Sequence, residues 1–226
     1  MKSLLTVLLF TSLTFGLKAQ TSLVKLVTSK GDITLMLYDQ TPKHRDAFLR
    51  NIKKGVFNGA QFNRVIKAFV SQAGELDDPI LEREKLHPEI PLVRIPAEIN
   101  PLLFHKKGAL GMGRNDNPEK SSYINQIYLV QGKKQTDAQL DAIEQKKGLK
   151  FSQAQREVYK SIGGTPHLDN DYTVFGEVIA GMDVAEAINN VATSSTDLPV
   201  ETISFKAIIL SAKDSRKILK KNRSVN

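Results

Sequence analysis

The sequence of 226 residues contains no cysteine, which excludes disulfide bonds, thiol catalysis and thiolate metal sites. It also lacks the motifs G-x-S-x-G and H-E-x-x-H and the P-loop, so these common catalytic sets are absent. The histidines do not have close metal-ligand spacing, and we expect them to be structural or solvent-facing; they are His44, His87, His105 and His167. No metal site and no cofactor are expected. A reaction that breaks no covalent bond would need none of these groups.

Residues 1–19 have the pattern of a signal peptide. Lys2 is followed by an uncharged apolar run over 4–17, and Leu17-Lys18-Ala19 offers a cleavage site before Gln20. The run is too short to span a bilayer, and nothing later in the sequence approaches a membrane span. The alternative is an N-terminal core helix. We expect an exported protein, periplasmic or secreted, with no cysteine for a lipoprotein anchor.

Positive charge is concentrated at the C-terminal end. The formal net charge is +8, but residues 213–226 hold six lysines and arginines against Asp214 alone, so the rest of the exported chain is close to neutral. We interpret 213–226 as a solvated basic tail, with contact to nucleic acid or an anionic surface as the alternative. The remaining residues 22–212 fit one domain with a substantial core.

Short alternating segments predict a mainly β domain. Residues 24–28 and 33–37 flank the turn signal Ser29-Lys30-Gly31-Asp32, which predicts a hairpin. Further strands are predicted at 108–112, 126–130, 173–178 and 203–209. Such short strands with turn residues between them are typical of an all-β sandwich or barrel.

Two helices are predicted beside these strands. Thr41-Pro42 supplies an N-cap and a first-turn proline for a helix over 42–54, in which Ala47, Phe48 and Ile52 share one face. A second helix begins at Gly181 and runs to about 190. Residues 75–101 contain five prolines and are predicted to be a loop.

The character of the sequence changes between about 131 and 164. Thr136 begins a capped helix with few apolar residues, and a second charged helix is predicted over 152–162. We interpret this segment as a helical hairpin inserted between two strands. Because loop-length changes cost little when core contacts are untouched, we expect that removing 136–161 leaves the barrel folded and its activity largely intact.

Residues 61–72, QFNRVIKAFVSQ, place one fixed cation and one amide among large apolar side chains. As a strand, the segment puts Phe62, Arg64 and Ile66 on one face before a turn at Lys67-Ala68. Because arginine does not lose its proton, Arg64 suggests recognition of a carbonyl or carboxylate rather than proton transfer. The alternative is an ordinary surface strand with an exposed arginine.

Four segments, in this order, resemble the cyclophilin-type peptidyl-prolyl cis-trans isomerases. The first is F-x-R-V-I-x-x-F-x-x-Q at 62–72; the others are GALGMGR at 108–114, NQIYL at 125–129 and TPHLDNDYTVFG at 165–176. The resemblance covers about 24–210 apart from the insertion, and GMDV at 181–184 is similar to the start of a family helix. It implies a closed eight-stranded antiparallel barrel capped by two helices, with an inserted helical hairpin.

The resemblance also implies the roles of individual residues. Arg64 falls on the family's catalytic arginine. The residues implied to bind substrate are Phe69, Val70, Gln72, Met112, Gly113, Arg114, Gln126, Tyr128, His167, Leu168 and Tyr172. The chain departs from the family pattern at Asn63, Arg114, Tyr128, His167 and Tyr172. In particular, the hydroxyl of Tyr128 must find a partner or water at the pocket floor.

The implied activity is rotation about X-Pro bonds in exported proteins that are folding. The implied partners are proline-containing peptides and unfolded or folding proteins, and we expect a monomer with no nucleic-acid partner and no membrane span. The alternative is a module of the same fold that holds proline-containing segments or partner proteins with little turnover. A third hypothesis is an adhesin that uses the basic tail. Turnover of an X-Pro peptide separates the first two.

Overall fold

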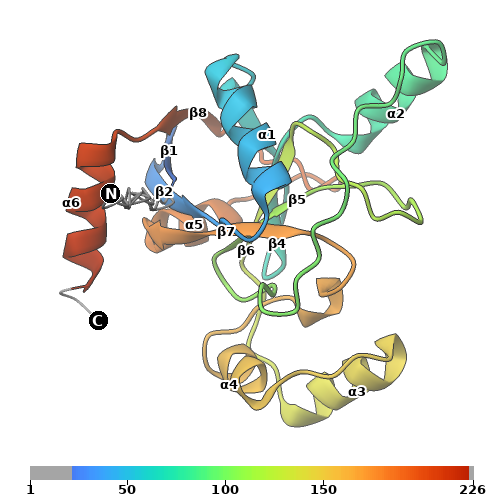
Figure 1. Ribbon diagram of the computed structural model, residues 1–226, viewed down its shortest axis with the longest axis vertical. Helices are drawn as coiled ribbons and strands as arrows, with labels where there is room; N and C mark the ends of the chain where they lie inside the picture. Colours follow the sequence, from blue (N-terminus) through green and yellow to red (C-terminus); the bar gives the residue numbers. More distant parts are fainter. Residues whose placement is uncertain (1–21, 224–226) are drawn as a thin grey trace, which may run out of the picture.

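The computed structural model describes residues 22–223 (Figure 1). The predicted signal peptide, residues 1–19, lies outside the described residues. Within the described part, six α-helices and one short 3-10 helix surround eight β-strands. No helix in that part is both long and apolar enough to cross a membrane.

The strands form one closed antiparallel barrel, in the order β1-β2-β7-β5-β6-β4-β3-β8. The predicted eight-stranded barrel is therefore confirmed. Their bounds are β1 Leu23–Thr28, β2 Gly31–Leu37, β3 Asn58–Ile66, β4 Val70–Gly74, β5 Ala109–Met112, β6 Gln126–Val130, β7 Val174–Ala180 and β8 Ser204–Ile209. The predicted first hairpin is present, with Thr28 opposite Gly31 across the turn.

Two helices close the barrel core, as predicted. Helix α1, Pro42–Lys53, buries Ala47, Phe48 and Ile52 together, and the Phe48 ring packs edge-on against Phe57 at 5.1 Å between centroids. Helix α5, Met182–Asn189, buries Ala185 and Ile188 in the same apolar cluster. Each helix thus turns one apolar stripe toward the barrel. Burial of this stripe explains the amphipathic pattern in the sequence.

The N-terminus of α1 is capped differently from the prediction. Thr41 occupies the cap position, but its side chain makes no capping hydrogen bond. Instead the Glu98 carboxylate, from the loop before β5, accepts from the backbone amides of Lys43 and His44 at 3.0 and 2.9 Å. It also accepts from Nδ1 of the buried His44 ring at 2.7 Å. A distant carboxylate can replace the local hydroxyl because the free amides and the helix dipole both favour an anion there.

This cap predicts a measurable loss of stability in Glu98→Ala. Two amides and a buried imidazole lose their acceptor, so the free energy of unfolding should fall by about 1–3 kcal/mol in urea titrations. Burial acts to raise the pKa of Glu98, but hydrogen bonds from His44 and the two amides outweigh it, and the pKa is lowered. This stabilisation is complete above the ordinary glutamate pKa of 4.5 and is lost as the pH falls through the lowered value. The exposed Glu119→Ala is the control, and equal stabilities would contradict the cap.

Helix α2, Asp77–Leu86, was missed in the sequence, which predicted a loop over 75–101. Figure 1 shows α2 extending away from the barrel. Its only fully buried residue is Ile80, so it lacks the periodic apolar stripe that would reveal a helix. Pro79 stands in its first turn, where a proline is tolerated. The rest of the predicted loop is irregular, apart from an isolated bridge between Ile95 and Ser122.

The inserted segment contains helices α3, Asp137–Lys147, and α4, Gln153–Ser161 (Figure 1). Both begin with a capping box, at Thr136 and at Ser152. The premise of the deletion prediction, that the hairpin makes no buried contacts with the rest of the protein, does not hold, because Tyr159 of α4 is fully buried and packs against Phe104 at 5.3 Å between ring centroids. The hairpin therefore has a small apolar core shared with the loop before β5. The effect of removing 136–161 stays a prediction.

The predicted basic tail is not simply a solvated end. Residues 212–223 form helix α6, Ala212–Arg223, which begins two residues after Leu210, whose amide donates to the Leu23 carbonyl at 2.9 Å. The Ser211 hydroxyl accepts from the backbone amide of Asp214 at 3.1 Å, as an N-cap does, and Ser215 is buried. Helix α6 thus has a defined start and one inward-facing position.

Candidate active site

A bulge in β3 sets the position of Arg64. The register with β4 shifts between Phe62 and Arg64, so Phe62 and Val65 are the buried residues of this strand. The predicted alternation, with Phe62, Arg64 and Ile66 on one face, is therefore wrong. A bulge bends a strand and redirects a side chain. Arg64 keeps 41% of its side chain exposed, and its Nε lies 3.7 Å from the Asp197 carboxylate.

The turn after β3 presents Phe69. Ala68 has a φ of 59°, in the left-handed region, and its amide donates to the side-chain oxygen of Asn189 at 2.9 Å. The amide nitrogen of Asn189, at the end of α5, donates to the Ile66 carbonyl and to the Ser71 hydroxyl at 3.1 and 3.0 Å. The sequence gave no indication of this role for Asn189. These three bonds fix the strained turn, and with it the place of the Phe69 ring.

Ten of the twelve predicted site residues line one open cavity of about 110 Å³. They are Arg64, Phe69, Val70, Gln72, Gly113, Arg114, Gln126, Tyr128, Leu168 and Tyr172. Asp77, which was not predicted, completes the lining. The cavity is smaller than the roughly 300–1,000 Å³ of sites for drug-sized ligands, so it suits one small ring rather than a whole cofactor.

The other two predicted site residues lie outside this lining. Met112 has no exposed surface and packs in the barrel core, because β5 points it inward. His167, in the 3-10 helix η1 (Pro166–Leu168), stacks on Phe69 with ring centroids 5.3 Å apart. His167 therefore supports the wall of the cavity from behind Phe69 rather than facing the cavity.

The floor of the cavity is Tyr128, and its hydroxyl has a buried partner. Its oxygen lies 2.8 Å from Nε2 of His105, whose Nδ1 lies 2.6 Å from the Asp169 carboxylate. Asp169 accepts at Nδ1, and the imidazole tautomer with its proton on Nδ1 offers Nε2 as an acceptor for the hydroxyl. Burial raises the pKa of Tyr128 well above its ordinary value, so the hydroxyl stays protonated and able to donate. The hydroxyl that was expected to need a partner thus has one in His105, which does not line the cavity.

Gly111 provides the room for this tyrosine. A Cβ on Gly111 would lie 2.1 Å from Cζ and 2.3 Å from the hydroxyl oxygen of Tyr128, far inside contact distance. Only glycine allows β5 and the Tyr128 ring of β6 to lie this close. The glycine of β5 and the large ring of β6 are therefore matched to each other in this chain.

Arg114 and Gln126 form the polar side of the cavity. The Arg114 guanidinium donates to the carbonyl of Asp171 at 2.7 Å and lies 4.9 Å above the Tyr172 ring. The Gln126 amide donates to the Glu75 carbonyl and to Asp77 at 2.8 and 2.6 Å. Both side chains are therefore held in place at the cavity edge before any ligand enters.

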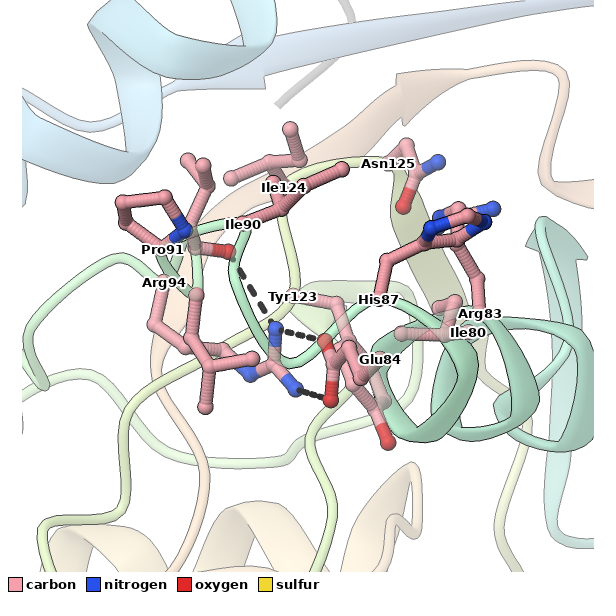
Figure 2. Close-up of a pocket in the computed structure, with 12 residues that line it drawn as sticks. Ile80, Arg83, Glu84, His87, Ile90, Pro91, Arg94, Tyr123, Ile124 and Asn125 are labelled. Carbon is pink, nitrogen blue, oxygen red and sulfur yellow. Dashed lines mark hydrogen bonds and ion pairs between the residues drawn. The ribbon is translucent and has the colours of Figure 1, made fainter.

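A second, more apolar cavity of about 190 Å³ lies under α2 (Figure 2). Ile80, Ile90 and Tyr123 face it, and Arg94 pairs with Glu84 at its edge. It contains none of the predicted site residues. Among residues 22–223 there is also no cluster of three or more potential metal ligands.

The site is thus a small open cavity at the side of a closed antiparallel β-barrel, with apolar walls at Phe69 and Leu168 and with Arg64 and two glutamines at its edge. Comparison with known proteins gives the family: residues 23–209 match the cyclophilin type peptidyl-prolyl cis-trans isomerase/CLD family. The chain belongs to this family of enzymes, which rotate X-Pro bonds.

Individual relatives agree with this assignment. A Staphylococcus saprophyticus protein that carries the name of a peptidyl-prolyl cis-trans isomerase is 31% identical over 188 residues, covering 82% of this chain and 90% of its own length. A Streptococcus pyogenes protein named as a bifunctional phosphatase and isomerase is 30% identical over 188 residues, covering 82% of this chain but 38% of its own length. The crystal structure of a Cryptosporidium parvum cyclophilin has the same fold, with a TM-score of 0.60 at 20% identity, covering 84% of this chain and 98% of that one.

Proposed function

We propose that this chain rotates X-Pro bonds at the cavity beneath Arg64, in proline-containing segments of exported proteins that are folding. The observation that carries the proposal is the pairing of a fixed guanidinium with a ring-sized cavity that has apolar walls on one side and polar groups on the other. The 110 Å³ space is walled by Phe69, Leu168 and the satisfied ring of Tyr128. A proline ring fits such a space by its size and its apolar surface.

The chemistry requires no proton transfer to an enzyme group. Rotation about the bond is opposed by a barrier of roughly 18–20 kcal/mol, because amide resonance is lost on the way over. In the twisted state the proline nitrogen regains a lone pair and the carbonyl loses its conjugation. Arg64 stabilises that state as a fixed donor, directly or through the backbone of the substrate. The amides of Gln72 and Gln126 border the same cavity and are placed to hold the substrate backbone.

The alternative function is a binding module of the same fold with little turnover. A hydroxyl of Tyr128 that faced the substrate would weaken proline binding and would favour this alternative. Its hydrogen bond to His105 removes this objection and favours the enzyme. The site is built from one chain, and we propose that it acts as a monomer on peptides and unfolded or folding proteins. The pattern of residues 1–19 supports a periplasmic or secreted location.

Turnover of a short Ala-Pro peptide by the purified protein, followed by NMR exchange spectroscopy, tests the activity. We expect exchange between the cis and trans forms to accelerate in proportion to enzyme concentration. Saturable binding of the peptide without faster exchange would favour the binding module instead. For the location, the full chain should be cleaved before Gln20 when it is produced in a bacterium and recovered outside the cytoplasm. An uncleaved cytoplasmic product would contradict export.

A further inference from the structure

The inserted hairpin reaches the floor of the cavity through three buried side chains. Tyr159 of α4 donates its hydroxyl proton to Oδ2 of Asp169 at 2.5 Å. The other oxygen of Asp169 accepts from the backbone amide of His105 at 2.9 Å and from its ring at 2.6 Å. His105 then accepts from Tyr128 at 2.8 Å. All four side chains are 8% exposed or less, so water does not compete for these bonds.

The hairpin also holds the wall of the cavity. Lys147, at the end of α3, donates to the carbonyls of His167 and Asp169 at 2.8 and 2.5 Å and to the Asp171 carboxylate at 2.6 Å. The segment 167–172, to which Lys147 is hydrogen-bonded, carries Leu168 and Tyr172, and both of these line the cavity. The two helices are therefore hydrogen-bonded both to the residues that support the floor and to the wall of one site.

We propose that the hairpin positions the prolyl cavity: Tyr159, through Asp169 and His105, holds the Tyr128 ring in the place that receives proline. Tyr159 and Lys147 are positioning residues, since neither lines the cavity. The inference rests on the proposed function, for which the cavity is the substrate site. Without the Tyr159 hydroxyl, Asp169 loses a donor, His105 is held less firmly, and the floor samples positions that do not accept the ring.

Tyr159→Phe tests the proposal, because it removes one hydroxyl and leaves the ring packed. When only a fraction of molecules has a competent site, the apparent affinity falls by that fraction, so we expect KM to rise by about threefold to tenfold while kcat changes little. The matched control is Tyr123→Phe, which removes a buried hydroxyl that has no hydrogen-bond partner and lies at the second cavity. It should leave both constants unchanged. A second pair is Lys147→Met, expected to raise KM, against its exposed neighbour Lys146→Met, expected to leave it unchanged.

A double variant separates positioning from a general loss of structure. If Tyr159 acts through the Tyr128 hydroxyl, Tyr159→Phe should change KM little once Tyr128→Phe is present, so the two effects do not add. We call the hydrogen bonds from Tyr159 through Asp169 and His105 to Tyr128 the relay. Effects on KM that multiply would contradict the relay, and so would a Tyr159→Phe enzyme that is as active as Tyr123→Phe.

Tyrosine ring resonances give a readout that needs no turnover. The chain has five tyrosines, and the signal of Tyr128 is identified by its loss in Tyr128→Phe. It should move in Tyr159→Phe and stay in Tyr123→Phe; an unmoved signal would overturn the relay. A wild-type protein without turnover would defeat the proposed function, whereas this shift would still decide the relay.

Discussion

Arg64→Ala should lower kcat/KM for X-Pro peptides by about tenfold or more while the protein stays folded. Arg64 is the donor above the cavity that can follow the developing lone pair, and loss of one such preorganised donor commonly costs several kcal/mol of transition-state stabilisation. The stability cost should be small, because the side chain is 41% exposed and its ion pair with Asp197 is 3.7 Å long. Exchange spectroscopy and urea unfolding of the same sample measure both quantities.

Two further variants show whether the loss of activity comes from the donor geometry of Arg64 or from the loss of a positive charge. Arg64→Lys keeps the charge but not the planar fork of donors, so its activity should lie between those of wild type and Arg64→Ala. Arg50→Ala removes an exposed arginine of α1 that does not line the cavity, and this variant should behave as wild type. A folded Arg64→Ala protein with unchanged kcat/KM would remove Arg64 from the mechanism.

Most of the barrel could be predicted from the sequence, because several strands and both closing helices bury one regular face. The alternation at Phe205 and Ala207 and the stripe at Ala47, Phe48 and Ile52 both correspond to buried residues. Helix α2 could not be found this way, since it buries Ile80 alone and the five prolines of 75–101 suggested a loop. The bulge after Phe62 was also missed, because it depends on pairing with β4 rather than on the local pattern.

The residues that line the cavity were predicted from the resemblance to a family. The residues that hold them in place, His105 and Tyr159, were not predicted. Phe69, Gln72 and Tyr128 stand in recognisable segments, and the structure brings them together. The Tyr128 hydroxyl was expected to need a partner, but nothing in the sequence pointed to His105, 23 positions away. Tyr159 belongs to an insertion that the motifs do not cover. Such side-chain networks are set by packing between distant elements, so a search for residues of suitable polarity near a motif does not find them.

Gly111→Ala should be among the most damaging single-methyl changes near the site. The new Cβ would stand 2.1 Å from Cζ of Tyr128, whose ring is 4% exposed, bonded to His105 and packed edge-on against Tyr172. The ring can move only by breaking the His105 bond or by entering the cavity. We expect kcat/KM to fall by about tenfold, and the free energy of unfolding to fall by about 1–3 kcal/mol, the usual cost of overpacking a core.

Comparison with a neighbouring glycine and a compensating change makes this expectation specific. A Cβ on Gly113 would instead meet the side chain of Gln126, which is held by hydrogen bonds to Glu75 and Asp77, so Gly113→Ala should lose stability without displacing the Tyr128 ring. Adding Tyr128→Phe to Gly111→Ala removes one of the clashing atoms and frees the ring from His105, so part of the stability and activity should return. Peptide exchange rates and urea unfolding of the four proteins decide between the outcomes. A fully stable and active Gly111→Ala enzyme, or a double variant worse than either single one, would show that the ring is not confined as the geometry requires.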